Sequence, residues 1–183
     1  MATQHWNIDR SHSGVHFTVR YMVSKVRGAF TTFWGSIDFD PEAPAASRAE
    51  VTIDAASIDT HEPQRDEHLR APDFLDVTRF PTLSFASTQV EEVGAHYRVA
   101  GEMTLHGVTR PVVMEVEALG RGKDQWGNER IGFAARTSIN RKDFGLGWNV
   151  VLEAGGVLLG ETVDIELDVQ AVKARAEERA AAR

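Results

Sequence analysis

The sequence predicts an all-β fold with one short helical insert, and three observations support this. Apolar and polar side chains alternate along most of the chain, which is the period of strands with one face in a core. The connections between these segments are short and rich in turn residues. Before the C-terminal tail, helical patterning is confined to a stretch near residues 60–71. Strands joined so briefly pair antiparallel, because parallel pairs need long crossover connections.

The N-terminal part of the chain supplies the first strands. "GVHFTVRYM" has an apolar face made of Val15, Phe17, Val19 and Tyr21. "VRGAFTTFWGSIDFD" keeps one apolar phase up to Phe30 and resumes it at Phe33, which predicts a bulge or sharp bend at Thr31 and Thr32. "AEVTIDAAS" follows, with Val51 and Ile53 in phase.

The chain after the insert alternates in the same way through "TLSFASTQV", "HYRVAGEMTL", "TRPVVMEVEAL", "RIGFAARTSIN" and "GETVDIELDVQA". A loop is predicted over "GRGKDQWGNE". The pattern gives seven or eight strands of about nine residues, and each would span about 30 Å. Such strands fit either a sandwich or a closed barrel, and the pattern alone does not choose between them.

The helical insert, "THEPQRDEHLRAPDFLD", is strongly polar, with Thr60 as its expected N-cap and Pro72 just after its end. So polar a helix indicates a lid over one end of the sheet structure. Its expected apolar anchors are Leu69, Phe74 and Leu75. Arg65 lies one turn before Leu69 and should point inward, where it either ties the lid to the barrel or faces a ligand head group.

Composition narrows the function classes. A chain of 183 residues with 42% hydrophobic and 26% charged residues is expected to form one domain. The net charge of −7 argues against nucleic acid or an anionic membrane surface as the main partner. The absence of cysteine excludes disulfides, thiolate metal sites and cysteine nucleophiles. With no membrane span and no secretory signal visible, a cytoplasmic protein is expected, or a periplasmic one if a signal has been removed.

The motifs of catalysis and metal binding are incomplete. "GGVLLGET" imitates a phosphate-binding loop, but Glu161 stands where lysine is needed. His12 and His16 on a strand would lie about 13 Å apart, too far to share one zinc ion. His61 and His68 flank the predicted helix and are expected to be structural or solvated. No metal site, catalytic residue or cofactor is therefore predicted.

Five segments together resemble the YceI-like family: "WNIDRSHSGVHFTVRY", "VRGAFTTFWGSIDFD", "ASIDT…RDEHLRAPDFLDVTRFPTLSF", "GEMTLHGVTRPV" and "INRKDFGLGWN". The likeness runs from about Trp6 to Val172. It implies an extended, lipocalin-like antiparallel β-barrel of eight strands over residues 1–172. The remaining residues 173–183 are rich in alanine and competent to form a helix, and we expect them to be a flexible or frayed helical tail. It also implies that the insert is the family's lid, and it carries over no catalytic residue. Tyr21 departs from the family, which often has histidine there.

The resemblance implies a lumen that holds a long-chain lipid, such as a polyisoprenoid or an isoprenoid quinone. The residues expected to line it are Phe17, Val19, Tyr21, Phe30, Val51, Ile53, Leu69, Phe74, Phe85, Met103, Leu105, Met114, Phe133 and Trp148. Arg65 is the candidate contact to a polar head group. Plain core packing would account for the apolar residues equally well.

Three functions are compatible with the sequence. The favoured one is non-catalytic binding, storage or transport of such a lipid. The second is an enzyme acting on a lipid head group with the histidines and carboxylates of the lid, although the helical phase places His61 and His68 away from the apolar face. The third is an empty barrel that acts through its surface, for example as a homodimer along an exposed strand.

Overall fold

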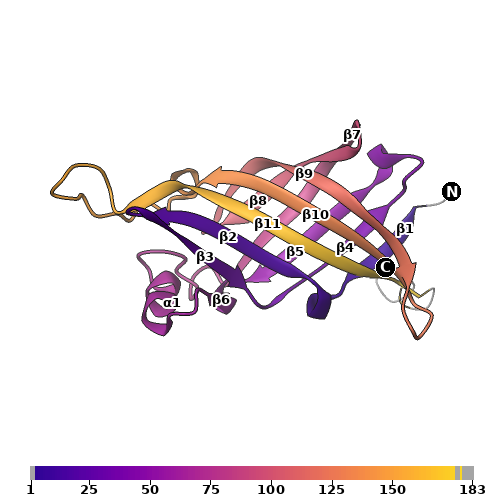
Figure 1. Cartoon of the computed structure of the whole chain (residues 1–183), viewed down its shortest axis with the longest axis horizontal. Coiled ribbons are helices and arrows are strands. Elements are labelled where there is room, and N and C mark those ends of the chain that lie inside the picture. The colour runs from indigo at the N-terminus through magenta and orange to yellow at the C-terminus, as the bar shows by residue number, and fades with distance from the viewer. Residues whose placement is uncertain (1–2, 176–177, 179–183) are drawn as a thin grey trace.

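The computed structural model describes residues 3–175 and 178, and it is an eight-stranded, closed antiparallel β-barrel with one short α-helix (Figure 1). The predicted fold class is confirmed. The strands of the first half are β1 (Gln4–Ile8), β2 (Gly14–Tyr21), β3 (Ser24–Phe30), β4 (Phe33–Phe39), β5 (Arg48–Asp54) and β6 (Ile58–Asp59). Those of the second half are β7 (Thr82–Val93), β8 (His96–Leu105), β9 (Val108–Lys123), β10 (Glu129–Asn140) and β11 (Leu159–Lys173).

Two pairs of short strands make the barrel close. β1 and β2 both pair with β11, and the 3₁₀ turn η1 (Arg10–His12) lies between them. β3 and β4 are separated at Thr31 and Thr32, where the sequence predicts a bend. β2 pairs with β3, and β1 pairs with β4. β1 and β2 therefore act together as one bent strand of the wall, and β3 and β4 act together as the next one. The ring then continues through β5, β7, β8, β9 and β10 to β11.

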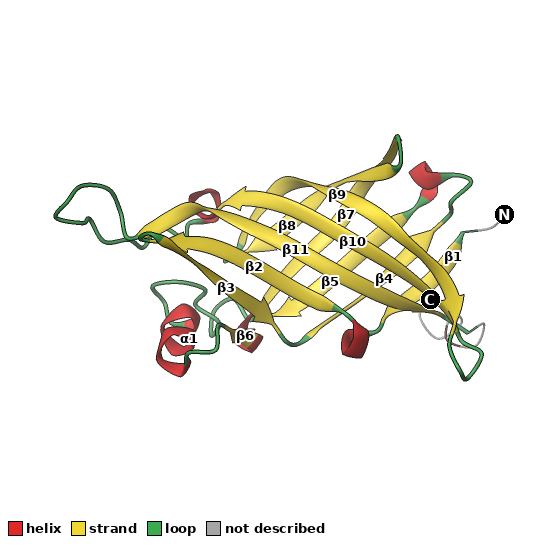
Figure 2. Cartoon of the chain, viewed as in Figure 1, coloured by secondary structure: helices red, strands yellow, loops and turns green. Residues whose placement is uncertain are grey.

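The helical elements lie outside the barrel or at its ends (Figure 2). The helix α1 (Pro63–Arg70) contacts β6, the two-residue strand that pairs with β3. The remaining 3₁₀ turns are η2 (Pro44–Ala46), η3 (Ala55–Ser57) and η4 (Arg141–Phe144). Among the described residues, no helix is long and apolar enough to cross a membrane.

One end of the barrel is filled by side chains. Trp6 has no exposed surface and packs with Phe39, Phe133 and other buried residues, and the Phe39 and Phe133 rings meet edge to face at 5.3 Å. The guanidinium of Arg121 lies 5.4 Å from the Trp6 ring centroid and covers this cluster from outside. The barrel is therefore closed at this end by its own core.

The structure corrects the sequence analysis at one loop and adds one strand. The predicted loop over residues 120–129 shrinks to a turn at 124–128, because β9 continues to Lys123. An extra residue in β9, Leu119, forms a bulge opposite β10, and Gly120 beside it takes a φ of 123°. The strand β1 was not predicted. β11 ends at Lys173, next to the predicted boundary at residue 172; most of the predicted tail lies outside the described residues, so this division of the chain stays a prediction.

Candidate functional site: the barrel lumen

A cavity of about 660 Å³ occupies the barrel between the Trp6 cluster and the lid. Its deep wall is made of inward-facing side chains from β2 to β11, which are the apolar members of the alternating strands. On β11, for example, Val163, Ile165 and Leu167 line the cavity, as their alternation predicts. This size lies within the range of small-molecule sites, about 300–1,000 Å³.

Two glycines make room for phenyl rings in the wall. A Cβ atom on Gly28 would overlap the ring of Phe17, and one on Gly101 would overlap the ring of Phe85. In both cases the glycine and the phenylalanine lie on neighbouring paired strands, β3 and β2 for the first and β8 and β7 for the second. The rings therefore lie flat along the wall across a neighbouring strand. This arrangement leaves the centre of the barrel open.

Every residue that the sequence analysis assigned to the lumen, and Arg65 as well, lines this cavity. They are Phe17, Val19, Tyr21, Phe30, Val51, Ile53, Leu69, Phe74, Phe85, Met103, Leu105, Met114, Phe133 and Trp148. Their contact with a ligand remains a prediction. Sequence reasoning missed Arg141, Leu146 and Leu158, which lie in η4 and the following loop, where no periodic pattern marks an inward face.

Polar side chains of the wall concentrate at the lid end. Glu62, Arg65 and His68 come from the lid and Arg141 comes from η4. Arg48, at the start of β5, is a charged wall residue outside this group. A ligand with one polar end and a long apolar part therefore matches the cavity best with its polar end at the lid.

The lid helix begins differently from the sequence prediction. Glu62, not Thr60, is the N-cap, and its carboxylate accepts hydrogen bonds from the backbone amides of Gln64 and Arg65 at 3.3 and 2.6 Å. Thr60 is buried instead, and both its amide and its hydroxyl donate to Oδ1 of Asp66, at 2.9 and 2.5 Å. The buried Asp66 carboxylate thus fixes the chain that leads into the helix.

Arg65 is partly satisfied by this same segment. Its Nε donates to the Thr60 hydroxyl at 2.7 Å and its Nη2 to the Thr60 carbonyl at 2.8 Å. Within the part of the chain that the structure describes, Nη1 has no hydrogen-bond partner. The side chain therefore both ties the lid together and keeps donors free at the cavity wall.

The expectation that both lid histidines lie away from the apolar face is wrong for His68. Its ring lines the cavity, meets Phe74 and Trp148 edge to face at centroid distances of 5.0 and 5.2 Å, and Nε2 lies 3.0 Å from Oδ2 of Asp73. His61 precedes the helix, with a φ of 61° and a side chain that is 88% exposed. The helical phase therefore does not relate the two residues. Among the described residues, no cluster of metal-ligating side chains is present.

Arg141 anchors the loop that follows η4. It is 3% exposed, and Nε donates to the carbonyl of Gly160 at 2.8 Å while Nη1 donates to those of Leu146 and Trp148 at 2.5 and 2.9 Å. Nη2 adds a longer contact to the Leu159 carbonyl at 3.3 Å. Burial lowers the pKa of Arg141, although Glu161 nearby opposes this. The bonds reach both arms of the loop, so they fix Trp148 beside the lid.

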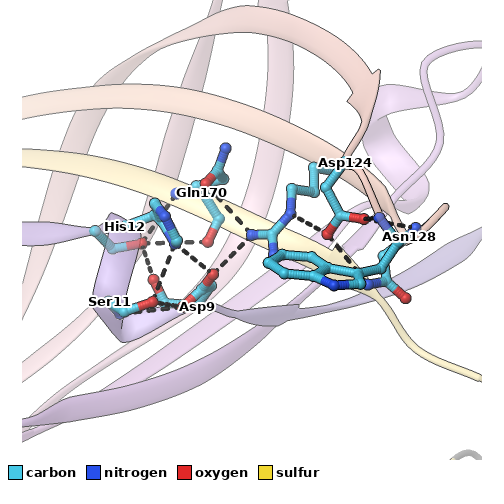
Figure 3. A network of polar contacts seen from close by, with 9 residues as sticks. Asp9, Ser11, His12, Asp124, Asn128 and Gln170 are labelled. Atoms are coloured by element: carbon cyan, nitrogen blue, oxygen red, sulfur yellow. Dashed lines mark hydrogen bonds and ion pairs between the residues drawn. The ribbon is translucent and has the colours of Figure 1, made fainter.

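A polar network lies outside the lumen, near the opposite end of the barrel (Figure 3). Arg130 donates to Asp9 at 2.7 Å and to Asp124 at 2.9 Å, and so joins the turn after β1 to the β9–β10 turn. Burial alone would raise the pKa of both carboxyl groups. Hydrogen bonds from Ser11, Arg130 and His12 nevertheless lower the pKa of Asp9, and those from Arg130, Asn128 and Trp126 lower that of Asp124 to about 2.

Comparison with known proteins agrees with this architecture of a closed antiparallel barrel with an apolar lumen. The model of the YceI-like domain matches residues 6–171. The protein YceI of Shigella flexneri is 37% identical over 171 residues, which cover 92% of this chain and 86% of the relative. The chain therefore belongs to the YceI-like family.

Solved structures share the fold. BcnA of Burkholderia cenocepacia superposes with a TM-score of 0.80 at 24% identity, over 89% of this chain and 98% of BcnA. A polyisoprenoid binding domain from Saccharophagus degradans, implicated in plant cell wall breakdown, gives a TM-score of 0.66 at 16% identity, over 92% and 98% of the two chains. At these identities the likeness concerns the barrel alone.

Proposed function

We propose that the protein binds and carries one long-chain amphiphilic lipid, of the polyisoprenoid or isoprenoid-quinone class, in the barrel lumen without catalysing a reaction on it. The observation that carries this proposal is the apolar cavity of about 660 Å³. A long hydrocarbon chain removed from water gains roughly 25 cal/mol per Å² of buried apolar surface. The wall offers this chain a continuous apolar environment.

The nature of the wall favours a flexible chain over a rigid planar ligand. Aromatic rings such as those of Phe17 and Phe85 are interspersed with aliphatic side chains in the wall. Met103 on β8 and Met114 on β9 also line the cavity. Methionine adapts its shape to an irregular neighbour because it is unbranched and polarizable. The kinship with a fold that includes a polyisoprenoid binding domain supports the same ligand class.

The lid end suits the polar head of such a lipid. Arg65 keeps donors free there, and the aromatic rings of Phe74 and Trp148 close over the cavity with centroids 5.0 Å apart. Arginine donors recognise phosphate oxygens and carbonyl oxygens alike. We infer that the head group lies beside Arg65 and the chain extends toward the Trp6 cluster.

Filling the lumen tests this proposal. Ala135 of β10 faces the cavity, and Ala134 precedes it on the same strand and faces outward, opposite Glu117 and Asp168. Ala135→Trp should place an indole in the lumen and abolish uptake of a polyprenol or ubiquinone offered in detergent, measured by native mass spectrometry. The matched variant Ala134→Trp should retain uptake. Equal uptake by the two variants would show that the ligand does not occupy the lumen.

A further inference from the structure

An apolar surface projects from the lid end of the barrel. It consists of the exposed residues Tyr21, Met22, Val23, Val150 and Val151, which we call the apical tip. Half of the exposed large hydrophobic residues in the described chain belong to it, and Val23 and Val151 are 100% and 80% exposed. So dense an exposed apolar group marks an interaction surface more often than chance scatter.

Backbone hydrogen bonds unite the two segments of the tip. The amide of Met22 donates to the carbonyl of Leu158 at 2.8 Å, and the amide of Leu158 donates to the carbonyl of Val150 at 2.9 Å. The 147–158 loop, orange in Figure 1, extends well beyond the end of the strands, with the β2–β3 turn at its base. The tip is therefore one protruding surface.

The turn between β2 and β3 holds an apolar side chain where the backbone disfavours it. Met22 has a φ of 51°, in the left-handed region that hairpin turns usually fill with glycine, asparagine or aspartate. Val23 follows, and because it is fully exposed its side chain does not pack against the rest of the protein. The side chains of Met22 and Val23 are therefore available for a contact made outside the chain.

The tip is also locally basic. Arg20 and Lys25 are directly opposite each other on β2 and β3, an arrangement that repulsion between like charges destabilises. Among the described residues, neither forms an ion pair with a carboxylate. Glu153 is the one acidic residue within segments 20–25 and 147–158. This local excess of positive charge contrasts with the net charge of −7.

The tip adjoins the opening of the cavity. Tyr21 belongs to the tip and also lines the cavity. Leu158, which is hydrogen-bonded to Met22 of the tip, lines the cavity too, and Trp148 of the same loop packs against Phe74 of the lid segment at the cavity wall. A surface that touched the tip would therefore also touch the mouth of the lumen.

We propose that the apical tip docks end-on onto a phospholipid bilayer that contains anionic lipids. Met22, Val23, Val150 and Val151 enter the boundary between head groups and acyl chains, and Arg20 and Lys25 contact lipid phosphates. Because the tip adjoins the cavity opening, insertion of the tip orients the barrel with its mouth toward the bilayer. In this orientation a lipid could pass between the bilayer and the lumen without contact with water. This consequence rests on the proposed function, whereas the docking itself does not.

Vesicle sedimentation tests the docking. The probe is a vesicle of phosphatidylcholine and phosphatidylglycerol in equal amounts, with phosphatidylcholine alone for comparison. The wild type should bind the mixed vesicles, and Val23→Asp with Val151→Asp should weaken binding by at least about tenfold, which corresponds to about 1.4 kcal/mol. Arg20→Ser with Lys25→Ser should remove the preference for the anionic vesicles.

A matched control separates the two ends of the barrel. Trp126 is 74% exposed at the β9–β10 turn, at the end opposite the tip, and Trp126→Ser should leave vesicle binding unchanged. Unchanged thermal unfolding of all variants establishes that they are folded. Absence of wild-type binding, equal binding by the aspartate variant, or loss in Trp126→Ser would each overturn the proposal. So would a dimer of the wild type in solution that the aspartate substitutions dissociate, because the tip would then bind a second copy.

The same samples separate this proposal from the proposed function. Uptake of a polyprenol from detergent without vesicle binding contradicts the docking and leaves the carrier function standing. Vesicle binding that the aspartate variant loses, together with a lumen that takes up no lipid, supports the docking and contradicts the carrier function.

Discussion

Arg141 is a buried cation that donates hydrogen bonds to backbone carbonyls of the loop after η4 and of the start of β11. The carbonyls of Leu146, Trp148 and Gly160 would lose their donors if it were removed. Each buried polar group left unsatisfied costs about 1–3 kcal/mol. The loop and Trp148 therefore depend on this one side chain.

Replacing Arg141 by Met should lower the free energy of unfolding by about 3 kcal/mol, because it leaves these acceptors unpaired. Urea denaturation measures this. Lys142→Met is the control, since Lys142 forms a half-exposed ion pair with Glu161 at 2.7 Å. Its loss should cost less than about 1 kcal/mol. Equal effects of the two substitutions would contradict the anchoring role of Arg141.

A substitution of His68 distinguishes the carrier function from the enzymatic alternative. His68→Phe keeps an aromatic ring between Phe74 and Trp148 and removes the nitrogen beside Asp73. If the protein is a carrier, lipid uptake should change by less than about twofold, which corresponds to about 0.4 kcal/mol of binding free energy. Mass spectrometry of lipid recovered after incubation provides the measurement. A ligand that the wild type alters chemically and the variant does not would establish the enzymatic alternative.

At the scale of elements, the Arg130 network links three parts of the barrel wall. The native pKa values of Asp9 and Asp124 are lowered, so both carboxylates stabilise the fold above the unfolded pKa of about 3.9. This contribution is lost as the pH falls from about 4 toward the native values, near 2 for Asp124.

Arg130→Gln should therefore lower the unfolding temperature most at neutral pH, and the difference from the wild type should narrow as the pH falls below about 4. Thermal unfolding followed by circular dichroism across this range measures it. Arg98→Gln removes a half-exposed ion pair with Glu115 at 3.8 Å and should give a curve parallel to that of the wild type. A constant difference between Arg130→Gln and the wild type would contradict the role of the network.

Most elements could be predicted because each strand buries one face, and burial on one face leaves a period of two in the sequence. The same signal identified the cavity-lining residues on β2, β5 and β8. It failed where local hydrogen bonds decide the structure. Thr60 is a good N-cap by residue type, but Asp66 captures its hydroxyl, and the Glu62 carboxylate reaches the free amides of the helix instead. β9 exceeded its predicted length because a bulge at Leu119 lets the strand curve on through a glycine-rich stretch.

At the scale of the whole molecule, a sequence of alternating strands does not distinguish a filled core from an open lumen. The same inward residues serve both, and the difference depends on how wide the closed ring is. Here the eight strands of the wall close around more space than their side chains fill, and the remainder is the cavity of about 660 Å³. One end is blocked by the Trp6 cluster, so the lipid that we propose as ligand would exchange at the lid end.

The central claim is that this cavity holds one lipid molecule. Native mass spectrometry of the purified protein, followed by solvent extraction and lipid analysis, tests it most directly. We expect one adduct per chain whose mass identifies an isoprenoid or similar long-chain lipid, and extraction should return that lipid. A clean mass of the protein alone, with no uptake when polyprenols and quinones are offered, would contradict the carrier function while leaving the barrel intact.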